Sequence, residues 1–126
     1  MMSGTWALWN IGVAGLIGAA GVALSAVAAH RVADPSLATA AMFLIVHAAA
    51  AMALSAVASG APLPVGFLAS ASLMILAVAL FSGDVAARVL GGGKLFPMAA
   101  PLGGSLLILA WVLAGLTGIV SAFRGH

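Results

Sequence analysis

The chain contains no cysteine and very few charged residues. Without cysteine it can form no disulfide, ligate no iron–sulfur cluster and use no thiol chemistry. Only 5% of its 126 residues are charged, whereas soluble proteins average about 25%. A soluble domain of this length would need a polar shell, and the residues for such a shell are missing. The composition therefore excludes an ordinary soluble globular protein.

Acidic residues are limited to Asp34 and Asp84. No pair of carboxylates is available for acid–base catalysis, and a serine–histidine–acid triad would lack its acid. Scattered histidines without cysteine predict no metal site, and four dispersed basic residues form no surface for nucleic acid. We therefore expect a protein that is not an enzyme, carries no metal or cofactor of its own, and binds no nucleic acid.

Long apolar segments without charge make up most of the chain. An α-helix needs about 20 such residues to cross a hydrocarbon core of about 30 Å. The third segment reaches that length only by extending to Arg88. The sequence predicts an all-α integral membrane four-helix bundle, a single transmembrane domain over residues 1–126 with no soluble appendage. Its spans are expected at about 6–29, 37–59, 65–88 and 98–122.

The connections between these spans are short, and their basic residues predict an orientation. Asp34 followed by Pro35 is typical of a helix start and begins the second span. The first and third connections carry Arg31, Arg88 and Lys94, whereas the opposite side carries Arg124. Because basic residues are enriched on the cytoplasmic side, this count places both termini outside the cytoplasm.

Small residues are expected to hold the helices together. Lipid tails are as apolar as leucine, so helices in a membrane associate through close contact of small side chains. Gly18, Gly21 and Ser25 follow one another at spacings of three and four residues in the first span. They predict a smooth packing seam, with bulky side chains facing lipid or a partner protein.

The start of the fourth span contains a proline and two glycines. Pro101 lacks the amide hydrogen of a regular helix, and Gly103 and Gly104 allow close approach of another backbone. We expect this segment to interrupt the span as a kinked entry. The alternative is a functional helix break whose free amides face an anion or a substrate.

His47 is the main candidate for chemistry, because it lies near the centre of the second span. Ionisable groups at that depth are rare and point to a functional hypothesis by default. Its candidate neighbours in a polar site at the membrane midplane are Trp111 in the fourth span and Ser72 in the third. Structural pairing is the favoured interpretation, and proton transfer or ligand contact is the alternative.

A second polar cluster is expected at the membrane boundary. It comprises His30 and Arg31 at the end of the first span and Ser82, Asp84 and Arg88 at the end of the third. Asp84 and Arg88 are four residues apart and can pair on one helix face. Since His30 and His47 differ in depth by about 15 Å, a haem held between them within one chain is not expected.

The order and spacing of these features resemble the DUF423 family of small four-span membrane proteins, from about Gly15 to Gly118. The chain departs from the family pattern at Leu44-Ile45-Val46 and at Asp84-Val85-Ala86. The resemblance implies a bacterial inner membrane location, eukaryotic relatives in organelle membranes, and no established activity. The segments that carry it are Gly15-Leu16-Ile17-Gly18, Ala29-His30, His47, Phe81-Ser82-Gly83, Pro101-Leu102-Gly103-Gly104 and Trp111.

Three functions follow as hypotheses. The leading one is a non-enzymatic accessory or scaffold subunit that contacts membrane lipids and other membrane protein subunits. The second is a small transporter or lipid-binding module that uses the site around His47. The third is a subunit associated with haem or quinone in a redox complex.

Overall fold

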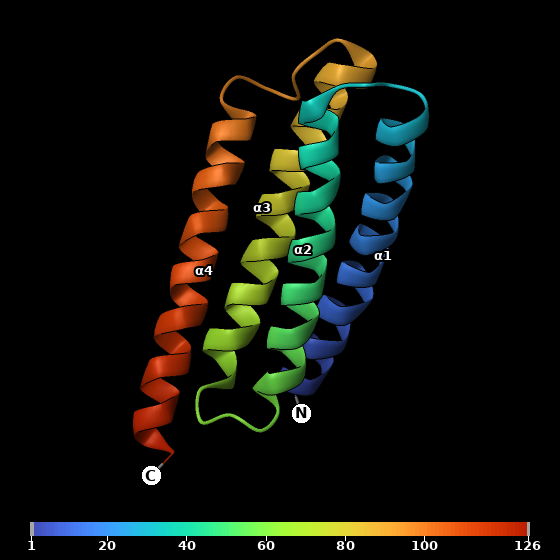
Figure 1. Cartoon of the computed structure of the whole chain (residues 1–126). Coiled ribbons are helices and arrows are strands. Elements are labelled where there is room, and N and C mark those ends of the chain that lie inside the picture. Colours follow the sequence, from blue (N-terminus) through green and yellow to red (C-terminus); the bar gives the residue numbers. More distant parts are fainter. Residues whose placement is uncertain (1, 126) are drawn as a thin grey trace.

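The computed structural model describes residues 2–125. Within this range the chain forms four α-helices, each long and apolar enough to cross a membrane by length and composition. The predicted all-α membrane four-helix bundle is confirmed. The helices, shown in Figure 1, are α1 Met2–His30, α2 Pro35–Ala58, α3 Pro64–Gly91 and α4 Ala99–Arg124.

The two central helices are α2 and α3, and the other two flank them. Helix α1 packs against α2 and α3, whereas α4 packs mainly against α3, on the far side of the bundle from α1 (Figure 1). The two ends of the chain lie at one end of the bundle, and the α1–α2 and α3–α4 connections lie at the other. As a result α1 buries only three residues, whereas α3 buries ten. The core therefore lies between α2 and α3.

Local signals in the sequence define the helix ends. Asp34 caps α2, because its side chain accepts a hydrogen bond of 2.8 Å from the amide of Ser36, and Pro35 takes the first helical position. Gly92 ends α3 with a φ of 78°, a left-handed conformation that glycine adopts at little cost. These starts and stops agree with the expected short connections.

The expected interruption at Pro101 does not occur. Helix α4 is continuous from Ala99, so Pro101 lies in its first turn. The first amides of a helix have no carbonyl partner within it, so a proline there costs no hydrogen bond. The amide of Leu102 already donates to the carbonyl of Met98 at 2.9 Å. The segment is therefore not a broken helix.

Glycines set the closest approaches between helices. A Cβ atom added to Gly21 would lie 2.9 Å from the Cβ of Leu44 and 3.1 Å from the backbone nitrogen of Ile45, both on α2. A Cβ at Gly18 would meet the Cβ of Ala48 at an ordinary 3.5 Å. Thus Gly18 and Gly21 lie in the α1–α2 contact, whereas Ser25 lies on the exposed side of α1.

The α3–α4 contact depends on glycine in the same way. A Cβ at Gly103 would lie 2.7 Å from the backbone nitrogen of Phe81, which cannot move without moving α3. At the other end, a Cβ at Gly66 would lie 3.1 Å from the Cβ of Thr117. Gly103, expected to form part of a helix break, is therefore a packing residue instead.

We predict that Gly21→Ala and Gly103→Ala each destabilise the bundle by about 1–3 kcal/mol, because the added methyl group overlaps a neighbouring helix. Gly12→Ala and Gly118→Ala are the matched controls, since an added Cβ meets no atom within 4 Å at either position. The measurement is unfolding in mixed micelles of a mild and a denaturing detergent. Equal stability of all four variants would contradict the glycine contacts.

Candidate functional site

His47 is held at the centre of α2 by two hydrogen bonds. Its side chain is only 6% exposed. The Nδ1 atom lies 2.8 Å from the carbonyl oxygen of Phe43, one turn earlier, and the Nε1–H of Trp111 on α4 donates to Nε2 at 3.0 Å. An indole nitrogen can only donate, so Nε2 accepts and the ring proton is assigned to Nδ1, which donates to Phe43. The geometry therefore fits a neutral imidazole with both nitrogens occupied.

Aromatic rings surround this pair and line a groove of about 440 Å³. The rings of Phe43 and Phe81 stack with centroids 4.9 Å apart, and the His47 and Trp111 rings meet edge to face at 5.8 Å. Trp111 is 48% exposed, so the groove opens on the outer surface of the bundle. The remaining lining residues all come from α4 and are Gly104, Leu107 and Ile108.

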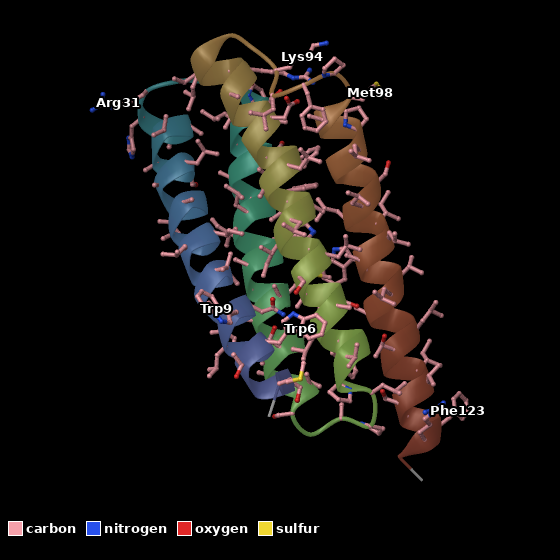
Figure 2. The ribbon with its side chains drawn as sticks, turned by 180° about the vertical axis from the view of Figure 1, so that it is seen from behind. Trp6, Trp9, Arg31, Lys94, Met98 and Phe123 are labelled. Carbon is pink, nitrogen blue, oxygen red and sulfur yellow. The ribbon has the colours of Figure 1, made fainter. Side chains whose placement is uncertain are left out.

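Ser72 does not join His47 and Trp111. Its hydroxyl accepts a hydrogen bond of 2.8 Å from the Trp6 indole and donates one of 2.8 Å to Oδ1 of Asn10, both on α1. The Asn10 amide nitrogen in turn donates to the carbonyl oxygen of Leu68 at 3.2 Å. These residues form the α1–α3 cluster, which joins α1 to α3 near the end of the bundle where Figure 2 labels Trp6.

Asn10 is the polar residue that the sequence analysis missed. It is the only asparagine of the chain and lies within the first predicted span. Since an amide in hydrocarbon must find a partner inside the protein, its position alone was a usable signal. In the structure it is buried, at 5% exposure.

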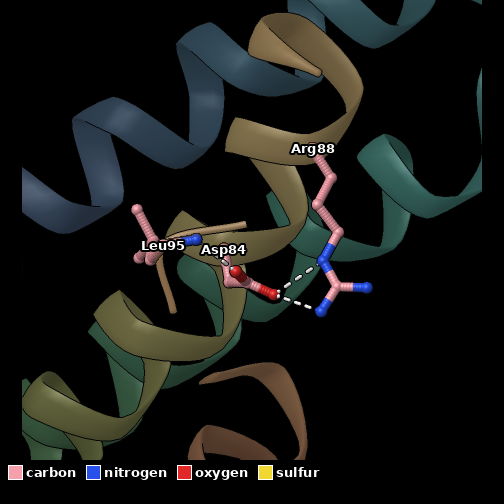
Figure 3. Close-up of polar contacts among 3 residues, drawn as sticks. All are labelled: Asp84, Arg88 and Leu95. Carbon is pink, nitrogen blue, oxygen red and sulfur yellow. Dashed lines mark hydrogen bonds and ion pairs between the residues drawn. The ribbon is translucent and has the colours of Figure 1, made fainter. Parts of the chain in front are cut away.

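At the opposite end of the bundle, Asp84 fixes the connection between α3 and α4 (Figure 3). Its side chain is fully buried. Oδ1 accepts the amide of Leu95 at 2.8 Å, while Oδ2 lies 2.9 Å from Nε and 2.8 Å from Nη2 of Arg88. The expected Asp84–Arg88 pair thus exists, and it also holds the backbone of the connection against α3.

The other boundary residues are not part of this arrangement. The Ser82 hydroxyl donates to the carbonyl oxygen of Ala40 at 2.9 Å and so joins α3 to α2. His30 and Arg31 are exposed at the end of α1, where Figure 2 labels Arg31. Within residues 2–125 no hydrogen bond or ion pair links them to Asp84. The expected boundary cluster therefore does not form. The Asp84–Arg88 pair and the Ser82 bond are separate, and His30 and Arg31 are exposed.

The chemical capacity of these clusters is limited by how completely they are paired. Proton transfer through His47 would need a partner that exchanges protons, and its two partners are the Phe43 backbone carbonyl and the Trp111 indole N–H. Among the described residues, no three His, Asp or Glu side chains lie close enough together to hold a metal ion. What the arrangement does directly is join helices: α2 to α4, α1 to α3, and α2 to α3.

We predict a favourable coupling energy between His47 and Trp111 of about 0.6–1.7 kcal/mol, which spans the average and the maximum measured for hydrogen bonds between membrane helices. A double-mutant cycle with His47→Leu and Trp111→Phe, measured by unfolding in mixed micelles, gives this value. A coupling indistinguishable from zero would mean that the bond does not stabilise the α2–α4 contact.

We also predict that Ser72→Ala destabilises the bundle by about 1–2 kcal/mol, because two interhelical hydrogen bonds are lost. Ser105→Ala is the matched control, since the exposed Ser105 hydroxyl bonds only to the Pro101 carbonyl of its own helix. The same unfolding assay applies. Equal effects of the two substitutions would argue against the α1–α3 cluster.

Comparison with protein-family models gives a match. The family model described as "Protein of unknown function (DUF423)" matches residues 17–104, which is more than half of the chain. The matched segment includes the Gly18–Gly21 contact, His47 and Gly104, and it ends before Trp111. No curated protein and no solved structure matches the chain. The resemblance inferred from the sequence is thereby confirmed, and the chain belongs to the DUF423 family.

Proposed function

We propose that this small membrane protein is a non-enzymatic accessory or scaffold subunit of a larger membrane complex. The observation that carries the proposal is the contrast between the paired polar side chains inside the bundle and the little-buried surfaces of its outer helices. His47 is bonded to Trp111 and to the Phe43 carbonyl, and Ser72 is bonded to Asn10. The outer surfaces of α1 and α4, by contrast, have little contact with the rest of the chain.

The outer helices present surfaces suited to another helix. Leu16 and Trp9 on α1 are 74% and 70% exposed. Gly12 on α1 and Gly115 on α4 are exposed as well, and a Cβ at either would meet no atom within 4 Å. Small residues in membrane helices serve close helix–helix contact, and within this chain these two glycines contact none. This pattern supports a partner helix on each outer face.

The paired state of His47 counts against a transporter. A transport site at the membrane midplane needs polar groups that can bind a substrate or exchange protons with water. The His47 ring is almost fully buried, and Phe43 and Trp111 use both of its nitrogens. The same pairing leaves no free imidazole nitrogen for a haem iron. The scaffold role therefore fits His47 better than transport or haem binding does.

We further propose a bacterial inner membrane location with both termini outside the cytoplasm. Arg31 and Lys94 lie at the same end of the bundle (Figure 2), and the ends of the chain lie at the other (Figure 1). Arg88 is one turn from the Lys94 end, and Arg124 is the only basic residue among those described at the opposite end. Basic residues favour the cytoplasmic side, which supports this orientation.

We predict that the chain, tagged and extracted from its native membrane in a mild detergent, migrates as an assembly larger than the monomer. Gly12→Leu or Gly115→Leu should release the associated subunit, because a bulky side chain blocks close helix approach. Ala79→Leu, at an exposed position of α3, is the matched control and should retain it. Light scattering coupled to size exclusion measures the mass.

Two outcomes would overturn the scaffold role. One is a monodisperse monomer with no associated protein after mild extraction. The other is an associated protein that persists equally in Gly12→Leu, Gly115→Leu and Ala79→Leu, since that protein would not depend on the outer glycine faces.

A further inference from the structure

The aromatic groove between α2, α3 and α4 is suited to hydrocarbon. Its walls are the stacked rings of Phe43 and Phe81 and the half-exposed ring of Trp111. The only polar groups beside it, His47 and the Trp111 indole nitrogen, are already bonded to each other. An occupant therefore gains nothing from bringing a hydrogen-bonding group to this depth, and an apolar chain fits best.

Gly104 is what keeps the groove open. A Cβ atom at this position would lie 3.8 Å from Cδ1 of Phe81, an ordinary contact, so the packing of α4 on α3 does not require glycine here. This distinguishes Gly104 from Gly103, where a Cβ would overlap the backbone of Phe81. The volume of about 440 Å³ is within the range of small-molecule sites.

A positive charge stands above this groove on the same helix face. Phe81, Asp84 and Arg88 follow at spacings of three and four residues on α3, so they share one face. Seven residues of helix place Arg88 about 10 Å from Phe81 toward the membrane boundary. The groove lies at the depth of lipid chains, and Arg88 lies near the depth of their phosphates.

Some N–H groups of the Arg88 guanidinium are not bonded to Asp84. Asp84 engages its Nε and Nη2 atoms, while the side chain remains 43% exposed. Leu95 and Arg88 approach Asp84 from opposite sides (Figure 3), so the connection to α4 does not cover the guanidinium. Of its five N–H groups, those on Nη1 are free to meet an anionic oxygen.

We propose that this groove binds one acyl chain of an anionic glycerophospholipid, whose phosphate contacts Arg88. The free Nη1 donors of Arg88 contact the phosphate, and their positive charge favours a headgroup that carries no cation of its own. The aromatic groove below Arg88 holds the chain. The inference goes beyond the scaffold role, because the groove can hold a lipid whether or not the protein joins a larger complex.

The test uses Trp111 as a reporter within the groove. Trp6→Phe with Trp9→Phe leaves Trp111 as the only tryptophan. Circular dichroism and unfolding first check this background, because Trp6→Phe removes the bond to Ser72. The protein is reconstituted into vesicles containing either phosphatidylglycerol or phosphatidylcholine with brominated chains, which quench tryptophan on contact. We expect phosphatidylglycerol to reach half-maximal quenching at a mole fraction about fivefold lower than phosphatidylcholine does. This is the preference that one contact with a basic residue contributes.

Matched variants distinguish the contribution of the groove to lipid binding from that of the Arg88 charge. Gly104→Leu should abolish the preferential quenching because it fills the groove, whereas Gly12→Leu, on α1, should preserve it. Asp84→Asn combined with Arg88→Gln keeps an acceptor for the Leu95 amide and should remove the preference for the anionic lipid. Lys94→Gln, which removes one positive charge at the same end of the bundle, should leave the preference intact.

Equal quenching by both lipids in the Trp111 background would overturn the proposal, as would quenching that Gly104→Leu does not change. A loss of preference in Lys94→Gln as large as in the paired variant would also overturn it, because general surface charge would then explain the effect. If the paired variant loses its helical signal, the comparison of the two lipids with Gly104→Leu and Gly12→Leu still decides the outcome.

Discussion

Hydrocarbon offers no hydrogen bond to a polar side chain, and the architecture of this protein follows from that constraint. Several polar groups buried within the spans bond to residues far away in the sequence, and each of these bonds joins two helices. His47 on α2 accepts from Trp111 on α4, and Ser72 on α3 joins Asn10 and Trp6 on α1. A hydroxyl–carbonyl bond, from Ser82 to Ala40, links the two central helices. These scarce polar residues therefore act first as ties between elements that lipid alone would not hold together.

Small residues complement these ties by determining how closely the helices approach. Gly21 brings α1 against the backbone of α2, and Gly103 does the same for α4 and α3. Dispersion contacts and hydrogen bonds are short-ranged, so they become effective only at such close approach. The central pair of helices is consequently well buried. The two outer helices keep one face toward the surroundings. The proposed partner helices would contact these faces, and the proposed lipid chain would occupy the groove beside α4.

The α3–α4 contact combines an ion pair at the membrane boundary with an open groove nearer the membrane centre. Asp84 neutralises part of the charge of Arg88 and fixes the α3–α4 connection at Leu95. Gly104, one residue after the tight contact at Gly103, leaves space that the rings of Phe43, Phe81 and Trp111 surround. Rigid packing and an open lateral surface therefore come from adjacent positions of one helix.

Composition and the lengths of apolar segments determined the fold class, because four uncharged stretches of this length have few arrangements other than membrane helices. The start of α2 at Asp34-Pro35 and the Asp84–Arg88 pair were equally predictable, since both are local and depend on spacing within one helix. The partner of Ser72, the role of Gly103, the exposed position of Ser25 and the continuity of α4 through Pro101 required the tertiary structure. Each of these depends on the rotation or register of one helix relative to another, or on where a helix begins. Hydropathy does not specify these quantities, because lipid accepts every apolar face equally well.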